Sequence, residues 1–161
     1  MKNKLSLILV VTLLFSISLS YAEENCTKED VVKAIDDSVA ILEKEGEAGL
    51  EAVGKLRFCG DNYVFVNNFD GVTLMHMKPS LIGKNLIALK DDTGKRFFAD
   101  FTDIAKSASI EIDGKTYFNG KGWASYRWPK PDEKTFSPKI SYIRGCKMGE
   151  KNVYVGAGIY E

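Results

Sequence analysis

The first third of the chain carries apolar residues at helical spacing. The recurring positions are Val31, Val32, Ile35, Val39 and Leu42. Thr27, followed by acidic residues, has the character of a helix start, because its hydroxyl can cap free backbone amides. The pattern predicts a helix over about 27–57, either continuous or made of two helices joined at Gly46.

From residue 61 onward the apolar period shortens to two, which is typical of β-strands. Runs of β-branched and aromatic residues between turn residues predict five strands, over 63–67, 72–77, 123–128, 139–144 and 153–160. Helical spacing returns only between residues 97 and 105. This order predicts an α+β fold, with an antiparallel sheet over about 61–161, short helical connections, and the helices on one side of the sheet.

The first 22 residues have the layout of a secretory signal peptide, with a basic start, an apolar run and small residues before Ala22. Cleavage after Ala22 would leave 23–161 as a single domain in the periplasm or outside the cell. The apolar run is shorter than the roughly 20 residues of a membrane span, so an uncleaved anchor is the weaker alternative. No second apolar run follows, and we expect no stable membrane insertion after cleavage.

Charge bears on the class of partner. The whole chain has 22 basic and 22 acidic residues, and removal of Lys2 and Lys4 with the leader gives the mature chain a net charge of −2. Binding to nucleic acid requires a basic face. The charge balance therefore argues against a nucleic-acid partner.

The three cysteines would enter an oxidising compartment, where disulfides persist. Cys59 precedes the first strand and Cys146 follows a later one, which favours a Cys59–Cys146 disulfide with Cys26 left over. Three unpaired thiols are the alternative. The chain has neither a CxxC pair nor a CxxCH motif, so we expect no zinc, no haem and no other cofactor.

Candidate chemistry is concentrated in the segment 120–131, which contains both tryptophans, Tyr126 and three cations. The single histidine, His76, lies in a turn-rich segment before it. Aromatic walls with a few cations suit the binding of a small anion, because they exclude water and supply charged donors. The sequence therefore predicts a pocket for such a ligand.

Several short segments together resemble a known family. They are YVFV (63–66), DG (70–71), LMH (74–76), PSLIGKNL (79–86), DTGK (92–95), GWASYRWPKP (122–131), KISY (139–142) and VGAGIY (155–160). In this order and spacing they resemble the single Cache domain, a small extracytoplasmic sensor module of bacterial chemoreceptors and histidine kinases. The resemblance implies a PAS-like five-stranded antiparallel sheet behind a long N-terminal helix. It also implies a pocket on one face of the sheet for short carboxylates such as acetate, propionate, lactate or pyruvate.

The chain departs from the family pattern in two respects. Met77 follows the histidine where the family usually has proline, and the chain shows neither flanking membrane helices nor an output domain. The second departure favours a free-standing periplasmic binding protein that presents its ligand state to a membrane receptor or kinase. The N-terminal helix would also provide a surface for a homodimer.

A carboxylate taken out of water needs charged or polar donors. The predicted ligand-binding residues are His76, Tyr126, Trp128, Lys130, Lys139 and Tyr142. Strand alternation places Tyr126 and Trp128 on one face and Arg127 on the other, so Arg127 is predicted to be a surface charge. Lys139 and Tyr142 also point to opposite faces, so one or the other is expected to face the ligand.

His76 is predicted to donate to the carboxylate through a ring nitrogen. Protonation near its usual pKa of roughly 6.5 would strengthen that contact. A hydrogen-bonded structural histidine is the alternative interpretation of this residue.

Two other functions compete with ligand sensing. The side chains of Phe97, Phe98, Phe118 and Met75 are large enough to fill the pocket, which would leave a structural or partner-binding module. A small periplasmic hydrolase would need His76 beside a serine or a free thiol. The chain has one histidine, no GxSxG motif and no metal-ligand set, so we expect that it is not an enzyme.

Overall fold

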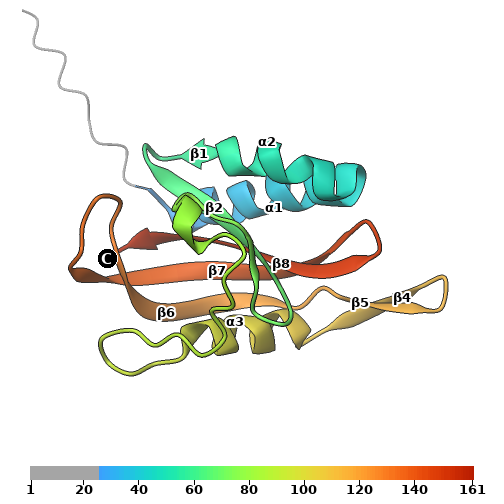
Figure 1. The fold of residues 1–161 in the computed structure, drawn as a ribbon. Coiled ribbons are helices and arrows are strands. Elements are labelled where there is room, and N and C mark those ends of the chain that lie inside the picture. The colour runs from blue at the N-terminus through green and yellow to red at the C-terminus, as the bar shows by residue number, and fades with distance from the viewer. Residues whose placement is uncertain (1–25) are drawn as a thin grey trace, which may run out of the picture.

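The structure is a computed structural model that describes residues 26–161. Figure 1 shows its elements, which are α1 (Lys28–Glu45), η1 (Gly46–Ala48), α2 (Gly49–Lys55), β1 (Arg57–Phe58), β2 (Asn62–Asn68), β3 (Thr73–Met75), η2 (Pro79–Leu81), α3 (Phe97–Lys106), β4 (Ser109–Ile112), β5 (Lys115–Phe118), β6 (Lys121–Pro129), β7 (Phe136–Met148) and β8 (Lys151–Tyr160). The predicted leader over 1–22 lies outside the described residues. Within 26–161, no helix has both the length and the apolar character that crossing a membrane requires.

Helix α1 begins at a capping box. The Thr27 hydroxyl accepts a hydrogen bond from the Asp30 backbone N–H at 3.2 Å, and the Asp30 carboxylate accepts one from the Thr27 N–H at 2.9 Å. The helix ends at Glu45 because Gly46 has a φ of 62°, in the region that favours glycine. A 3-10 turn, η1, then leads into α2. The N-terminal helical segment is therefore two helices joined at Gly46, the second of the two predicted forms.

The main sheet is antiparallel and has the order β1-β2-β8-β7-β6, with β3 also paired to β2. All five predicted strands are present, as β2, β3, β6, β7 and β8, and β1 adds a two-residue sixth strand. The last strand of the chain, β8, therefore lies between β2 and β7. The predicted α+β class with a PAS-like antiparallel sheet is confirmed.

A second sheet, formed by β4 and β5, is absent from the sequence prediction. Most of its residues are exposed, so no alternation of buried and exposed positions marks the two strands. The turn between them consists of Asp113 and Gly114, with φ values of 51° and 75°. Asp-Gly is typical of the two-residue turn of a type I′ hairpin, and this is the sequence signal that identifies the second sheet.

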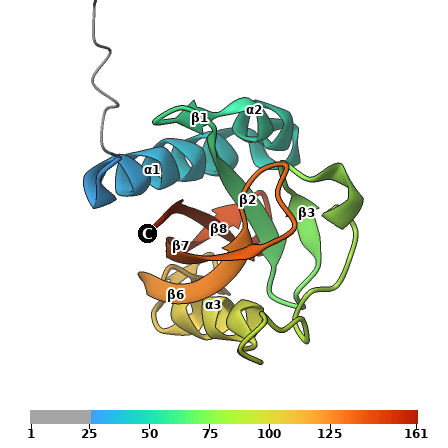
Figure 2. The same ribbon diagram turned by 90° about the vertical axis from the view of Figure 1, so that its left-hand side faces the viewer.

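Helices cover both faces of the main sheet, as Figure 2 shows, whereas the sequence prediction placed them on one. On one face α1 packs Val31 and Ile35 into an aliphatic core, and on the other α3 packs Phe97 and Phe101 into an aromatic core. The reason lies in the central strand β8, where every residue over 153–158 is buried. A strand that is apolar on both faces needs a covering layer on each side.

The disulfide joins Cys26 to Cys59, whose Cα atoms are 5.5 Å apart, and Cys146 is a buried free thiol. The predicted Cys59–Cys146 pairing is therefore wrong. Cys146 lies inside β7 opposite Val153, and Val153 in turn lies opposite Asn68 at the end of β2. Cys59 lies just before the start of β2, so the length of β2 separates the two cysteines. At roughly 3.3 Å per strand residue this separation is about 20 Å, whereas a disulfide spans a Cα distance of about 4 to 7 Å.

We predict that iodoacetamide added to the unfolded but unreduced protein labels Cys146 alone. Cys26 and Cys59 are protected by their disulfide, and unfolding of β7 exposes Cys146. Peptide mass analysis locates the label. The folded protein serves as the control, because burial raises the pKa of the Cys146 thiol to about 12 and should keep its labelling slow. A label on Cys26 would contradict the pairing.

Candidate functional site

A row of side chains crosses three strands on the α3 side of the sheet. Lys139 of β7 lies opposite Tyr126 of β6 and opposite Tyr160 of β8. Residues directly opposite each other in an antiparallel pair project to the same face, so Lys139 has a tyrosine on each side. Tyr63 of β2 completes the group, with its ring centre 4.4 Å from the Lys139 Nζ.

The Lys139 ammonium is buried without an anionic partner. The residue is 1% exposed, and its Nζ lies 4.4 Å from the Tyr63 ring centre and 4.5 Å from the Tyr160 ring centre. None of the ion pairs between described residues includes Lys139. The two rings offer cation–π contacts, which offset part of the lost hydration. Burial, and then the nearby charge of Lys78, lower the pKa of Lys139 to about 7.

His76 is a neutral imidazole in the same group of side chains. Its ring lies edge-on to the Tyr63 ring at 5.1 Å and to the Trp128 ring at 6.1 Å. The Nδ1 atom accepts a hydrogen bond from the Lys78 backbone N–H at 2.9 Å, which places the single ring proton on Nε2. Burial, and then the charges of Lys139 and Lys78, lower the pKa of His76 to about 3. The expected protonation near pH 6.5 is therefore wrong for the unliganded site.

Tyr126 and Trp128 form an aromatic wall with the first residue of α3. The Phe97 ring stacks on the Tyr126 ring at 4.6 Å and meets the Trp128 ring edge-on at 5.7 Å. The hydroxyls of Tyr126 and Ser141 share a hydrogen bond at 3.0 Å. This bond holds the Tyr126 end of the wall in place.

The Trp128 N–H is a buried donor that lacks a partner in hydrogen-bonding geometry among residues 26–161. Burial raises the pKa of the neighbouring Tyr63 hydroxyl, and the Trp128 and Tyr160 side chains oppose that rise. Trp128 therefore lies near the Tyr63 hydroxyl without a well-formed hydrogen bond to it. Leaving a buried donor unpaired costs free energy, so this N–H is available to a ligand.

Two of the predicted site residues lie outside this group. Tyr142 points to the opposite face, where its ring packs 5.1 Å from the Trp123 ring. Lys130 is exposed in the β6–β7 loop, with its Nζ 5.9 Å from the Tyr160 ring centre, and so lies at the rim. Of the two alternatives left open by strand alternation, it is Lys139 that lies on the α3-side face.

Sequence reasoning missed three members of the group, Tyr63, Lys78 and Tyr160. The Lys78 Nζ lies 5.5 Å from the Trp128 ring centre. Alternation along β8 could have assigned the face of Tyr160. Only the pairing register brings Tyr160 beside Lys139, however, and a register cannot be derived from one strand alone.

A surface hollow of about 350 Å³ opens beside the group. It is lined by the segments 77–80 and 131–132, which follow His76 and the β6 wall strand. His76, Trp128 and Lys139 are 6%, 8% and 1% exposed. The residues that line the hollow include Lys78 but not His76, Trp128 or Lys139.

The side chains considered for filling the pocket divide between different parts of the fold. Phe97 and Phe98 belong to the aromatic core on the α3 side. Met75 belongs to the aliphatic core beneath α1, and Phe118 on β5 packs 5.1 Å from the Phe69 ring. Of the four, Phe97 and Phe98 share a core with Trp128.

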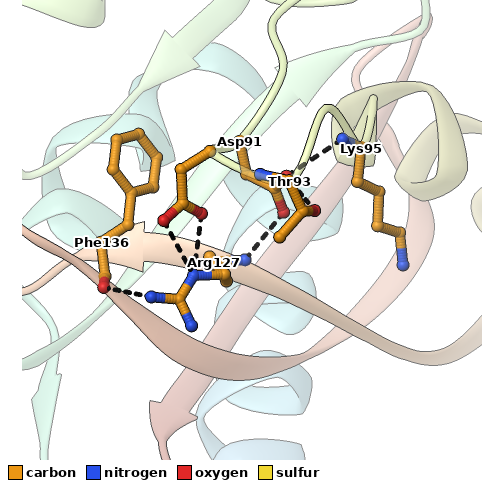
Figure 3. A network of polar contacts seen from close by, with 6 residues as sticks. Asp91, Thr93, Lys95, Arg127 and Phe136 are labelled. Atoms are coloured by element: carbon orange, nitrogen blue, oxygen red, sulfur yellow. Dashed lines mark hydrogen bonds and ion pairs between the residues drawn. The ribbon is translucent and has the colours of Figure 1, made fainter.

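A polar network fixes β6 along its free edge (Figure 3). The Asp91 carboxylate accepts backbone N–H bonds from Thr93 at 2.9 Å, from Lys95 at 3.0 Å and from Arg127 at 3.1 Å. Since β6 is an edge strand, the Arg127 N–H faces away from β7, and Asp91 supplies the partner that the edge lacks. Burial raises the pKa of Asp91, but these hydrogen bonds and one from the Thr93 hydroxyl outweigh it and hold the pKa below its usual value.

The Arg127 side chain extends the same network away from the wall. Its Nε donates to Asp92 at 2.8 Å, and a terminal nitrogen donates to the Phe136 carbonyl at 2.8 Å (Figure 3). The prediction that Arg127 points away from the aromatic wall is confirmed. These contacts tie β6 and the start of β7 to the loop that leads into α3.

The group contains hydrogen-bond donors that suit an anion, and its histidine is not paired with a nucleophile among the described residues. The Ser141 hydroxyl is bonded to Tyr126, and the acceptor nitrogen of His76 is occupied by the Lys78 N–H. Within residues 26–161, then, no hydroxyl is positioned with His76 as its base. The remaining donors are the Lys139 Nζ, the Trp128 N–H and the His76 Nε2–H.

The only cluster of potential metal ligands that the described residues form consists of Cys26, Asp30 and Cys59. Its two sulfurs form the disulfide and are therefore not thiolates that could bind a metal. The Asp30 carboxylate is already used in capping α1. This cluster does not hold a metal while the disulfide is intact.

The family described as Cache domain matches residues 28–161, almost the whole of the described chain. The chain belongs to the Cache domain family. The resemblance carried by the sequence motifs is confirmed.

Two relatives of this Cache domain are signalling proteins. Methyl-accepting chemotaxis protein McpP of Pseudomonas putida is 28% identical over 115 residues, which make up 71% of this chain and 19% of McpP. Sensor histidine kinase MctS of Rhizobium johnstonii is 28% identical over 101 residues, 62% of this chain and 19% of MctS. The chain thus spans about a fifth of the length of these relatives, and the likeness concerns that part alone.

Solved structures share the fold of this Cache domain. A periplasmic sensor domain of a chemotaxis protein is 28% identical with a TM-score of 0.62, over 82% of this chain and 88% of that one. A methyl-accepting chemotaxis protein from Vibrio parahaemolyticus is 26% identical with a TM-score of 0.61, over 80% and 82%. A Cache chemosensory domain described for carboxylic acid recognition is 24% identical with a TM-score of 0.68, over 82% and 91%, and this likeness concerns the fold. The family thus supports periplasmic ligand sensing.

We predict that Asp91→Asn lowers the free energy of unfolding by about 1 to 3 kcal/mol, because the amide cannot accept all the hydrogen bonds that the carboxylate accepts. Urea unfolding at pH 7 measures the loss. The matched control is Asp92→Asn, which breaks only the half-exposed pair with Arg127 and should cost about 0.5 kcal/mol or less. Equal losses in the two variants would mean that Asp91 does not anchor the edge of β6.

We predict that Lys139→Met stabilises the unliganded protein at pH 6 by an amount on the order of a few kcal/mol, since the folded-state pKa is lowered from 10.5 to about 7. The penalty for burying the charged amine is complete below about pH 7, shrinks as the pH rises towards 10.5, and is absent above it. The stability difference from the parent, measured by thermal unfolding across this range, should fall accordingly. Lys121→Met, at an exposed site on β6, should show no such trend, and a less stable Lys139→Met at pH 6 would refute the prediction.

Proposed function

We propose that the chain is a periplasmic sensor domain that binds a short-chain monocarboxylate, of the acetate, propionate, lactate or pyruvate class, at Lys139. The observation that carries the proposal is the buried Lys139 ammonium, which is 1% exposed and has no carboxylate partner among residues 26–161. A buried charge is ordinarily paired. The ligand is the group that pairs it.

The surrounding donors favour a carboxylate over a neutral ligand. The Trp128 N–H lacks a partner, and the neutral His76 carries its proton on Nε2. Together with Lys139 they offer one charged and two neutral donors, which is close to the number of hydrogen bonds that a carboxylate accepts. The rings of Tyr63 and Tyr160 exclude water and so strengthen each of these contacts.

Cations at the rim guide an anion inward. Lys78 lines the hollow and lies over the Trp128 ring, and Lys130, which directly precedes the lining segment 131–132, lies over the Tyr160 ring. Like-charged side chains beside a cleft raise the local concentration of the opposite charge. Lys130 therefore acts on the rate of ligand entry, and Lys139 on ligand affinity.

The proposed cellular setting is supported by the predicted leader and by the relatives. Secretion with cleavage after Ala22 would deliver the domain to the periplasm, where the related sensor domain of a chemotaxis protein operates. A membrane receptor or kinase is the proposed partner, in line with the similarity to McpP and MctS. A second copy of the chain, docked through α1, is the proposed dimer partner, and the role of the domain is binding without catalysis.

We predict that millimolar acetate, propionate, lactate or pyruvate raises the melting temperature of the parent protein, because a ligand that binds only the native state stabilises it. The shift should increase with ligand concentration. Lys139→Met should abolish it, since the variant has no charge to pair with the carboxylate. Differential scanning fluorimetry at pH 6.5 measures both.

The exposed control Lys134→Met should keep the full ligand-induced shift. A parent protein that no member of the panel stabilises would contradict carboxylate binding. That result would support the alternative of a structural or partner-binding module, in which Phe97 and Phe98 close the site permanently.

A further inference from the structure

We propose that the site takes up its carboxylate together with one proton, which passes from solvent to the Lys139 Nζ, so that occupancy above neutral pH follows the product of anion and proton concentrations. This inference rests on the proposed function and adds the chemical form in which the ligand is sensed. It means that the domain responds to the amount of acid, rather than to the anion alone.

The geometric basis is an amine that is enclosed before the ligand arrives. The Lys139 Nζ lies between the ring centres of Tyr63 and Tyr160, at 4.4 Å and 4.5 Å, and the residue is 1% exposed. Transfer of an unpaired ammonium from water to such a place is costly, and a neutral amine avoids that cost. The lowered pKa of Lys139, about 7, agrees with this geometry.

The tyrosines around Lys139 do not supply the proton. Tyr63 of β2, Tyr126 of β6 and Tyr160 of β8 all have a raised pKa, chiefly because burial disfavours the phenolate. All three are therefore neutral from pH 6 to 9. They remain hydrogen-bonding walls while Lys139 changes charge.

Three other ionisable groups lie near Lys139 or its neighbours. His76 stays neutral because its pKa is about 3. Lys78, from the same segment after β3, is a cation that disfavours a second positive charge on Lys139. Glu133, from the β6–β7 loop, acts on Tyr160 and forms no ion pair with Lys139. Lys139 is thus the group that titrates when the ligand binds.

A carboxylate beside the Lys139 amine shifts its protonation equilibrium from the neutral amine to the ammonium form, because an opposite charge at contact favours the charged form. The complex then contains one positive and one negative charge and is neutral overall. A dicarboxylate would bring a second negative charge into the same enclosure without a partner, and its desolvation would oppose binding. The site should therefore prefer monocarboxylates to dicarboxylates such as succinate.

Isothermal titration calorimetry tests the proton uptake directly. Acetate, propionate, lactate and pyruvate are each titrated into the whole protein at pH 8, in HEPES and in Tris, whose ionisation enthalpies differ. The difference in observed enthalpy gives the number of protons, which should be about 0.9 per ligand at pH 8 and about 0.1 at pH 6. The dissociation constant should rise about fivefold to tenfold between pH 6 and pH 8.

A variant at the rim assigns the proton to Lys139. Lys78→Met removes the neighbouring cation, so the pH at which affinity starts to fall should move upward, whereas the exposed control Lys134→Met should leave it in place. Binding without proton uptake at pH 8, or an unchanged breakpoint in Lys78→Met, would overturn the proposal and leave the proposed function standing. If no member of the panel binds at any pH, the proposed function itself fails, and this inference fails with it.

Discussion

The candidate site depends on a buried amine, that of Lys139, which faces aromatic rings instead of a carboxylate. Ring faces attract an ammonium, but they replace only part of the hydration that it loses on burial. Had the fold placed an aspartate within reach of Lys139, that aspartate would compete with every ligand at a high effective concentration. Tyr63 and Tyr160 enclose the charge without satisfying it. In the proposed function, a bound carboxylate would supply the compensation that the two rings leave incomplete.

Burial of the Lys139 amine needs a sheet that is covered by helices on both faces. Beneath α1 the core is mainly aliphatic, with Val31, Ile35 and Leu42 packed against the sheet, and it contains none of the proposed ligand donors. On the α3 side the core is aromatic, and its rings supply flat walls and polar edges. The wall strand β6 is an edge strand, which would ordinarily be free to fray. Asp91 pairs its outward-facing N–H and so fixes the wall at the position where Tyr126 and Trp128 flank Arg127.

The sequence predicts those features that depend on alternation within one strand. The outward direction of Arg127, and the opposite directions of Lys139 and Tyr142, follow from the pleat alone. The sequence does not predict features that depend on pairing between strands. The row from Tyr126 through Lys139 to Tyr160, for example, exists only in the observed register. The sequence does not predict the disulfide for a similar reason. Cys26 reaches Cys59 because Cys26 directly precedes α1, which packs on β7 and β8 and also contacts β1, and the spacing of cysteines carries no information about that packing.

The methionine that follows His76 leaves the imidazole's orientation intact. The hydrogen bond that fixes the ring comes from the backbone N–H of Lys78 and not from residue 77. A proline at position 77 would lack its own N–H but would leave that of Lys78 in place. Since Nδ1 is occupied in either case, the ring proton remains on Nε2. In the proposed site, His76 is therefore a neutral donor beside Lys139, and Lys139 is the one group whose charge changes when the ligand binds.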